Sequence, residues 1–579
     1  MSNSSFRTTI DPRTGFEIIG EGSTGGKVRG LGLAHSLLAS EAELRDRYPQ
    51  VEIDIPRTLV IACSGFDTYV RENGLDGLAQ TELPDEAIEA RFLGGGLPAE
   101  MEAALLDYLQ RTHTPLAVRS SSMLEDLDYH AYAGLYRTYM LSNDQADIAQ
   151  RLDRLAEAVK LVFASTYYVD PRAYARRVGH KIDSCAMAVI IQQVVGRRHG
   201  RFYYPAISGV AQSRNYYPLG GMKADEGLAT IALGLGKQVV SGERALRFCP
   251  KYPKRLLQRS SAQEVLDFAQ RGFYAVEMDT SVTWRRDRRD HTVQRMVGDA
   301  LEEPPVQMLA GTYVPAEQRI RDTILAEGWR VLTFANVLKY DLFPLAGILQ
   351  DILALGEKAL GTVEIEFAVD LAPDKSHKHQ FYLLQMRSMT ARQDGLEVVI
   401  TSEERKRALC YSPNTMGNVR HQEVGDVVYI KPDAFDPART REMVRCVAEI
   451  NADLGRRRRQ YLLVGPGRWG SRDPWLGIPV QWNDIAGVGA IVETAGEKLN
   501  ADPSQGSHFF HNLTAMGISY LCVTRRPEDK FDWPWLTGQP RMQHNEMVHH
   551  VRLRHPLQIK VDGRRSLGVI RSYQAGDNG

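Results

Sequence analysis

Two carboxylates stand two residues apart in the stretch GTVEIEFAVD, residues 361–370. In a β-strand, successive side chains point to opposite faces, so Glu364 and Glu366 share one face and the apolar residues between and beside them share the other. Like charges this close repel unless a cation neutralises them. Magnesium bound to nucleotide phosphates would do so, because Mg²⁺ prefers one or two carboxylates together with phosphate oxygens.

A second run, FYLLQMRSM at 381–389, repeats the alternation and predicts a hairpin with the first, joined by the loop that holds Pro373 and Asp374. The alternation assigns Leu383, Gln385 and Arg387 to one side of this strand. An alternative keeps the hairpin without a metal: a solvated edge strand in which Arg387 pairs with Glu366 across the ladder.

Arg119 follows the apolar run Leu116-Ala117-Val118 and precedes three serines, 120–122. We expect the strand to end there, where a guanidinium is well shaped for bidentate contact with phosphate oxygens. The serines could add hydroxyl and amide donors. They could equally cap a helix, with Ser122 as N-cap and Glu125 completing a capping box.

Glycines also precede a cation in GEGSTGGKVRGLG, where Gly25 and Gly26 lead into Lys27 and an amphipathic helix. Backbone amides, a helix N-terminus and a lysine together could cradle an anion. The spacing is not that of a Walker A loop. A Gly-Gly turn before a surface lysine is the simpler interpretation.

Composition limits the classes of function. The chain has 579 residues, of which 43% are hydrophobic and 25% charged, and Lys plus Arg equals Asp plus Glu at 71 each. No bulk charge favours nucleic acid or anionic lipid, so an anion must be held by local geometry. The six cysteines form no CxxC pair, and neither a signal peptide nor a span long enough for a bilayer is evident. We therefore expect a cytoplasmic protein that binds neither nucleic acid nor membrane.

The length of the chain and a change in its sequence pattern near residue 395 predict two structural units. Residues 1–395 alternate strand-like and helical patterns and predict an α+β domain. Residues 396–579 form a smaller α/β module, with a strand at DVVYIKP and a helix at TREMVRCVAEINADLGRRRR.

Four motifs in order across residues 20–395 resemble the N-terminal ATP-grasp domain of phosphoenolpyruvate synthase, pyruvate phosphate dikinase and rifampin phosphotransferase, a PEP/pyruvate-binding domain family. GGKVRGLG is similar to GGKxxxLG, AVRSSSMLEDLDYHAYAGLYRT to AVRSSATxEDxxxxSFAGxxxT, and GLGKQVVSG to GLGExVVxG. VEIEFAVD with FYLLQMRSMT resembles DIEWA with LxxLQxRPxT. Lys237 stands where the family has glutamate, SRNY at 213–216 replaces a TRDP-like motif, and Glu364 replaces a common aspartate.

The resemblance implies a nucleotide site with ATP and Mg²⁺ as cofactors. Lys27 and Arg119 would contact phosphates, and Glu364 and Glu366 would hold the metal. The remaining positions that the resemblance assigns are Gly134 and Thr138 in the loop over the nucleotide, Gln192 near adenine, and Gln385 and Arg387 in the γ-phosphate region.

Because too few residues follow position 395 for both, we do not expect the C-terminal module to hold the swivelling phosphohistidine domain and the pyruvate-binding barrel of the larger family members. QGSHFF offers His508 as a candidate phosphoryl carrier, and His511 lies nearby, although a structural histidine is the commoner case. GPGRWGSRDPW, with Arg468, Trp469 and Ser471, could bind an anion or a flat substrate.

These observations favour an ATP- and Mg²⁺-dependent phosphotransferase with an unidentified acceptor. Arg119, Arg387 and His508 are its candidate catalytic residues, and the chain could assemble as a homodimer. Two alternatives use the same fold: a carboxylate ligase that forms an acyl phosphate, and a non-catalytic ATP sensor.

Overall fold

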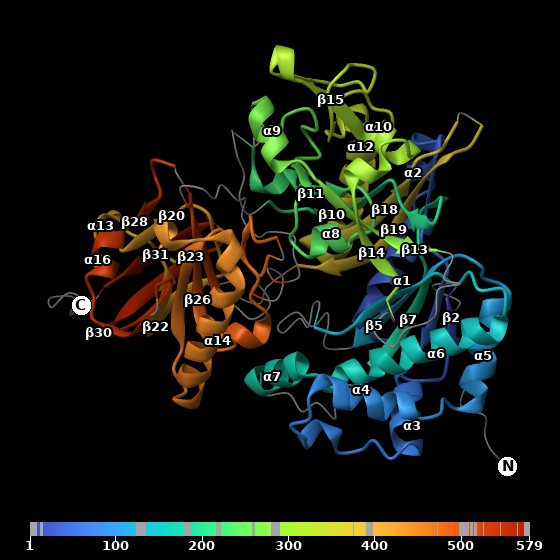
Figure 1. Cartoon of the computed structure of the whole chain (residues 1–579), viewed down its shortest axis with the longest axis horizontal. Coiled ribbons are helices and arrows are strands. Elements are labelled where there is room, and N and C mark those ends of the chain that lie inside the picture. The colour runs from blue at the N-terminus through green and yellow to red at the C-terminus, as the bar shows by residue number, and fades with distance from the viewer. Residues whose placement is uncertain are drawn as a thin grey trace.

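The computed structural model has a mixed α/β architecture built on several sheets (Figure 1). It describes residues 8–11, 16–122, 135–178, 187–215, 222–256, 261–278, 290–374, 376–389, 398–471, 473–496, 509, 513, 518–524, 526–544, 546–563 and 565–572. No helix in these parts of the chain combines the length and the apolar composition that crossing a bilayer requires.

The first sheet has six strands, and helices cover one of its faces. Its order is β1 (Thr8–Ile10), β2 (Glu17–Ile19), β4 (Thr58–Ile61), β7 (Met187–Gln193), β5 (Leu116–Ser122) and β6 (Thr138–Leu141). The covering helices are α3 (Cys63–Glu72), α4 (Asp85–Gly94), α5 (Ala99–Gln110), α6 (Ile148–Ala164) and α7 (Val169–Val178). Apolar strand residues such as Val118 and Ile191 join helix residues such as Phe92 and Phe163 in one buried core, which supplies most of the hydrophobic stabilisation here.

The second sheet also has six strands. Its order is β12 (Leu246–Phe248), β11 (Leu228–Ala232), β10 (Ile207–Gln212), β18 (Val363–Asp370), β19 (His379–Ser388) and β3 (Val51–Asp54). Helices α1 (Gly25–Ser40) and α12 (Leu345–Leu360) pack against it, and residues such as Leu31, Ile352 and Phe367 form its core.

The predicted hairpin of β18 and β19 is confirmed, but one side of its second strand was assigned wrongly. Glu366 pairs with Gln385, and Phe367 pairs with Leu383, so Leu384 is an extra residue on β19. This bulge reverses the alternation beyond it. Leu383 is therefore buried in the apolar core and does not share the face of Gln385.

Two smaller sheets flank these layers. One comprises β14 (Thr292–Met296), β13 (Gly272–Glu277), β9 (Phe202–Tyr204) and β8 (Arg197–His199); the other comprises β16 (Arg319–Arg321), β15 (Ala310–Val314) and β17 (Trp329–Leu332). The short helices of the N-terminal part are α2 (Ala42–Arg47), α8 (Lys237–Val240), α9 (Ala262–Phe268), α10 (Pro304–Leu309) and α11 (Ala335–Leu338).

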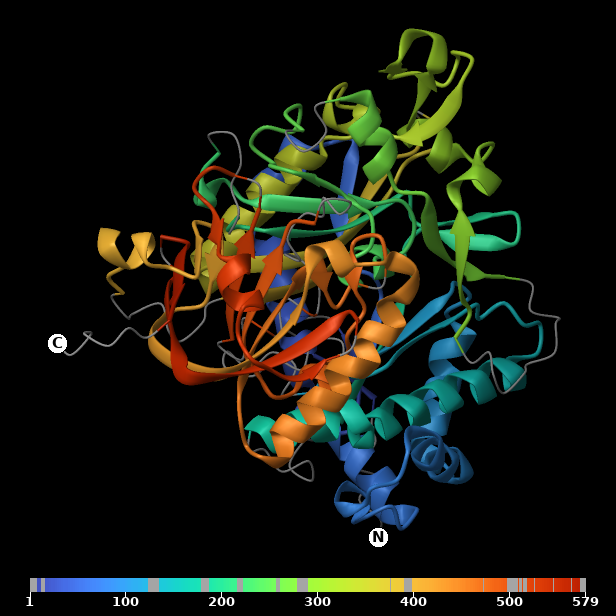
Figure 2. The same ribbon diagram turned by 60° about the vertical axis from the view of Figure 1, so that its left-hand side comes forward.

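The C-terminal residues form a separate, larger sheet, seen in orange and red in Figures 1 and 2. Its order is β21 (Thr415–Met416), β27 (Ser519–Val523), β26 (Val488–Thr494), β23 (Tyr461–Pro466), β22 (Val419–Ile430), β30 (Val548–Asp562), β31 (Leu567–Arg571), β20 (Cys410–Ser412) and β28 (Lys530–Phe531), with β29 (Arg541–His544) paired to β30. The predicted strand and helix of this module correspond to β22 and α14 (Thr440–Arg456).

Parallel pairing joins β22, β23, β26 and β27 in the C-terminal sheet, so the loops that leave these strands lie along one edge. The loop after β23 holds β24 (Arg468–Trp469) and β25 (Gly477–Ile478), and α13 (Ser402–Lys406) and α16 (Trp533–Thr537) complete the module. The predicted division at residue 395 falls within 390–397, outside the described residues, and stays a prediction.

Helix α1 connects the two six-stranded sheets through glycines. A Cβ at Gly25, whose φ is +80°, would lie 1.9 Å from the carbonyl oxygen of Ser121 on β5, and a Cβ at Gly30 would lie 2.1 Å from that of Met386 on β19. Only glycine permits such close backbone approach. These contacts fix the distance between the helix and both sheets.

We predict that Gly30→Ala destabilises the N-terminal part by about 1–3 kcal/mol, the usual cost of overpacking. Denaturant unfolding followed by circular dichroism measures the change. Gly455→Ala on α14 is the matched control, because open space surrounds that position and alanine favours a helix over glycine. Equal midpoints for Gly30→Ala and the wild type would contradict this account of the α1 contact.

Candidate functional site

Arg119 lies in the middle of an internal strand of the first sheet. It pairs with Ile190 on β7 and with Thr138 on β6. The expectation that the strand ends at this residue is wrong, because β5 continues through Ser122. The strand continues because the serines are buried against α1, where small hydroxyl side chains fit beside Gly25.

The serines bind the start of helix α1. The Ser121 hydroxyl accepts from the amide of Val28 at 3.3 Å and donates to the carbonyl oxygen of Thr24 at 2.8 Å. These two hydrogen bonds attach the first turn of α1 to β5. Ser122 is a strand residue, and Glu125 of the predicted capping box lies outside the described residues.

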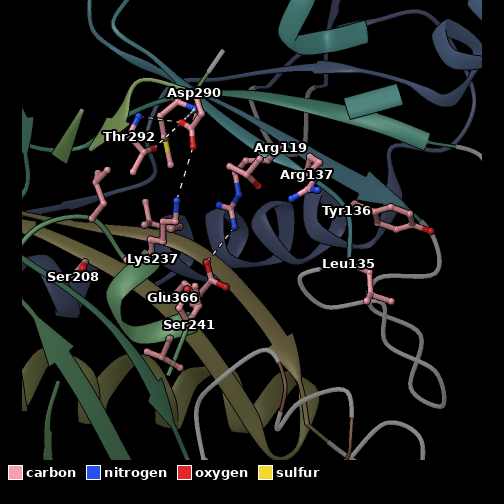
Figure 3. Close-up of a pocket in the computed structure, with 18 of the residues that line it drawn as sticks. Arg119, Leu135, Tyr136, Arg137, Ser208, Lys237, Ser241, Asp290, Thr292 and Glu366 are labelled. Atoms are coloured by element: carbon pink, nitrogen blue, oxygen red, sulfur yellow. Dashed lines mark hydrogen bonds and ion pairs between the residues drawn. The ribbon is translucent and has the colours of Figure 1, made fainter. Parts of the chain in front are cut away.

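The guanidinium of Arg119 joins the two sheets. Its Nη2 donates to Glu366 Oε2 at 3.1 Å and to Gln385 Oε1 at 3.2 Å. Figure 3 shows Arg119 directed at Glu366 across the space between the layers. Two oxygens from adjacent strands thus face the same cationic nitrogen.

Glu364 lies on the same face of β18 but is more deeply buried, with a side chain 3% exposed. Its Oε1 accepts from Arg387 Nε at 2.8 Å, and its Oε2 accepts from Gln212. The ladder register places Arg387 opposite Glu364, and β18 lies between β10 and β19. The alternative of a solvated edge strand with an Arg387–Glu366 pair is therefore wrong.

Lys27 lies on the first turn of α1 beside Arg119. Its Nζ donates to the carbonyl oxygen of Ser120 at 3.0 Å and to the Ser120 hydroxyl at 3.3 Å. Gln192 on β7 is buried, and its Nε2 donates to Thr58 Oγ1 at 3.2 Å. Gly134, His508 and His511 lie outside the described residues.

A cavity of about 610 Å³ lies between the sheets. Four of the sequence-predicted residues line it: Arg119, Thr138, Gln192 and Glu366. The other four lie next to these lining residues. Gln385 accepts a hydrogen bond from Arg119, and Lys27 donates to Ser120, which follows Arg119 in the chain. Glu364 and Arg387 form an ion pair with each other on the strands that carry Glu366 and Gln385. The structure thus brings the described candidates from both sheets to one region.

Lys237 also lines the cavity. The sequence analysis noted it only because the family has glutamate at this position of its GLGE motif. Its Nζ lies 3.9 Å from Asp290 Oδ2 and 5.0 Å from the centroid of the Tyr274 ring. Asp290 Oδ1 accepts from Thr292 Oγ1 at 2.7 Å and from the Met140 amide at 3.1 Å. No motif in the sequence indicated that Asp290 would lie here.

The C-terminal module also contributes to the cavity wall. Gly470, Val480, Trp482 and Phe509 are among its lining residues. No pattern in the sequence could predict this, because the contact depends on how two distant segments pack.

Hydrogen bonds attach the loop after β23 to the N-terminal part. Arg468 Nη1 and the Ser471 hydroxyl donate to the carbonyl oxygen of Gly242 at 3.0 and 3.2 Å, and Arg244 Nε lies 3.3 Å from Asp473 Oδ2. Trp469 is 1% exposed. Arg468, Ser471 and Asp473 in the loop after β23 therefore contact residues of the N-terminal part of the same chain.

Asp170, near the start of α7, is a second carboxylate that sequence reasoning missed. Burial, with the nearby charges of Asp484 and Asp85, raises the pKa of Asp170 to about 6, while Arg137 and a hydrogen bond from the Asn483 backbone act in the opposite direction. It lines the cavity at the junction of the two modules. A carboxyl group of this kind can exchange a proton near neutral pH.

We predict that Asp170→Asn makes the chain more stable at pH 7.5. A raised folded-state pKa means that ionised Asp170 opposes folding, so stability falls as pH rises from about 4 to about 6. The asparagine variant escapes this loss, which is about 3 kcal/mol. Thermal unfolding should show a higher Tm for the variant at pH 7.5 and a difference that shrinks as pH is lowered to 4. A lower Tm than wild type at pH 7.5 would refute the assignment.

Comparison with known proteins identifies the larger part of the chain. The family model described as pyruvate phosphate dikinase, AMP/ATP-binding domain, matches residues 21–408. This match confirms the resemblance seen in the four motifs. It includes the described candidates for the nucleotide site: Lys27, Arg119, Thr138, Gln192, Glu364, Glu366, Gln385 and Arg387.

Three relatives illustrate the range of this similarity. A phosphoenolpyruvate synthase of Aeropyrum pernix is 24% identical over 236 residues, covering 37% of this chain and 26% of that protein. An uncharacterised phosphotransferase of Bacillus subtilis, YvkC, is 26% identical over 193 residues, covering 33% and 20%. A rifampicin phosphotransferase of Streptomyces sviceus is 30% identical over 150 residues, covering 25% and 15%. The chain thus spans about a quarter or less of the length of these relatives.

Proposed function

Because this chain belongs to the pyruvate phosphate dikinase family of AMP/ATP-binding domains, we propose that it is an ATP- and Mg²⁺-dependent phosphotransferase. The observation that carries the proposal is the contact of Arg119 on the first sheet with Glu366 and Gln385 on the second. Charged and polar groups from two layers converge beside a cavity of a size that suits a small-molecule ligand. The names of the relatives agree with phosphoryl transfer.

In this proposal, ATP lies between the two sheets of an ATP-grasp domain, and the C-terminal residues form a smaller α/β domain. Gln192 stands beside the base, where Ala117, Val194 and Leu235 supply apolar contact. Lys27 and Arg119 bind phosphate oxygens. Thr138, with Gly134, belongs to the segment over the nucleotide.

The residues present fit a magnesium ion. Glu366 lines the cavity, and its carboxylate oxygen and the Gln385 amide oxygen already face one cationic nitrogen. Oxygen donors of this kind suit Mg²⁺, which when bound would neutralise charge on the phosphates. Glu364 stays a predicted ligand, and its contact with Arg387 holds that guanidinium near the same region.

In catalysis, the protein would position the phosphates of ATP and neutralise their negative charge. Phosphoryl transfer demands little covalent chemistry from side chains, so fixed cations beside the terminal phosphates supply most of the effect. Arg119 and Arg387 are held near the cavity by carboxylates on β18 before ATP binds.

We predict that Glu366→Gln lowers product formation from Mg·ATP at least about 100-fold, a size typical for loss of one electrostatic group in an active site. Glu357→Gln on the exposed side of α12 is the matched control and should match wild type. Circular dichroism checks that both variants fold. Wild-type rates in Glu366→Gln would remove the proposed site.

Labelled ATP distinguishes the reaction classes. With ATP labelled at the β- and γ-phosphates, AMP and phosphate indicate dikinase chemistry, whereas ADP indicates a kinase or, when an amine or thiol is required, a ligase. Binding of ATP without any product would instead support an ATP sensor.

A further inference from the structure

Helix α8 and its flanking residues form part of the cavity wall, and the residues that contact the C-terminal module follow at once. The lining residues of this segment are Leu235, Gly236, Lys237, Val240 and Ser241. The contacts with the loop after β23 begin at Gly242 and include Arg244. Figure 3 shows Lys237 and Ser241 among the residues around the cavity. One short segment therefore carries both a cavity wall and the contacts between the modules.

Gly242 is attached to helix α8 on one side and to the C-terminal module on the other. Its amide donates to the carbonyl oxygen of Val239 at 2.9 Å, and its carbonyl oxygen accepts from Arg468 Nη1 at 3.0 Å and from the Ser471 hydroxyl at 3.2 Å. Its φ of +68° is a conformation that favours glycine. A movement of the loop after β23 would therefore move the end of α8.

An ion pair lies two residues further along the chain. Arg244 Nε lies 3.3 Å from Asp473 Oδ2, and the two side chains are only 17% and 18% exposed. The Gln238 side-chain amide donates to the Arg244 carbonyl oxygen at 3.0 Å, which attaches the pair to α8 as well. Removing one partner of a pair buried this far leaves the other charge unpaired, which is costly. The pair therefore fixes the loop after β23 relative to α8.

Contacts with the C-terminal sheet hold the loop after β23 in place. The Trp469 amide donates to the buried Glu493 carboxylate of β26 at 2.8 Å. Gly477 packs against Arg468 so closely that a Cβ at this glycine would lie 1.9 Å from the Arg468 carbonyl oxygen. The hydrogen-bond donors of this loop therefore reach α8 from a fixed support.

The C-terminal module also forms a wall of the same cavity. Its lining residues are Gly470, Pro479, Val480, Gln481, Trp482 and Phe509. A ligand that fills the cavity therefore contacts walls from both modules. Because binding free energies are reciprocal, a ligand that holds the two modules together is itself bound more tightly when they are docked.

We propose that the loop after β23 is a positioning element of the nucleotide site and that the docked C-terminal module slows release of the nucleotide. This inference rests on the proposed function, because it places ATP in the cavity. Arg468, Ser471 and Asp473 are the positioning residues: they do not line the cavity, and they act on α8 through Gly242 and Arg244. The segment GPGRWGSRDPW thereby affects the nucleotide without binding a ligand of its own.

The test measures release of a fluorescent nucleotide from the full chain. The N-methylanthraniloyl derivative of a non-hydrolysable ATP analogue is bound with Mg²⁺, and excess unlabelled ATP then displaces it in a stopped-flow instrument. Arg244→Asp and Asp473→Arg should each raise the rate constant of release at least about 10-fold, a size typical of coupling between sites. The double variant forms the ion pair in reverse and should return the rate toward that of wild type.

Rescue by the double variant separates positioning from damage to the fold, because two damaging substitutions would add instead of cancelling. Arg468→Ala removes one of the two donors to Gly242 without a new charge and should also speed release. This variant keeps the test decisive if a charge reversal prevents folding. Trp475→Ala is the matched control and should release at the wild-type rate, because Trp475 belongs to the same loop but is 64% exposed and lies outside the cavity lining.

Hydrogen exchange supplies the reciprocal measurement. The bound analogue should slow amide exchange in the loop after β23 of wild type, and it should do so less in Arg244→Asp at equal occupancy of the site. Equal protection in both proteins would contradict the coupling between the nucleotide and the docked module.

Release at the wild-type rate from Arg244→Asp, Asp473→Arg and Arg468→Ala would overturn this inference and leave the proposed function standing. A double variant that releases as fast as the single reversals would overturn it too. A wild type that binds no Mg²⁺–nucleotide would instead refute the proposed function, and this inference with it.

Discussion

The contact of one guanidinium with two strands of the opposite sheet is the constraint on which the site depends. Arg119 reaches Glu366 and Gln385 only because β5 runs beneath β18 and β19, and that placement is fixed by helix α1. The glycines at 25 and 30 let this helix touch the backbone of both sheets. A buried ion pair of this kind gains little net stability once desolvation is counted, which favours a functional reason for its presence.

The second ion pair on the same face has a different environment. Glu364 is almost fully buried and contacts both Arg387 and Gln212, whereas Glu366 borders the cavity. Two carboxylates two residues apart therefore avoid repulsion by taking separate arginines. Ligand phosphates entering the cavity would compete with Glu366 for Arg119, which couples ligand binding to rearrangement of one pair while the other keeps the strands in register.

Local pattern predicted the parts of this site that depend on one or two strands. The alternation in GTVEIEFAVD predicted that Glu364 and Glu366 share one face of a strand. The apolar run before Arg119 predicted the first part of strand β5. The bulge at Leu384 left no local signal, because an inserted residue looks like continued strand. The serines were taken for a strand end because their burial depends on α1, which packs there from a distant part of the chain. Asp170 and Trp482 were missed for the same reason: only tertiary packing brings them to the cavity.

A crystal structure of the chain with Mg²⁺ and a non-hydrolysable ATP analogue tests the central claim most directly. The account predicts the triphosphate between Arg119 and the Glu366–Gln385 pair, with the base toward Gln192. An analogue bound elsewhere on the protein, with the Arg119–Glu366 contact unchanged and the space between the sheets unfilled, would contradict it.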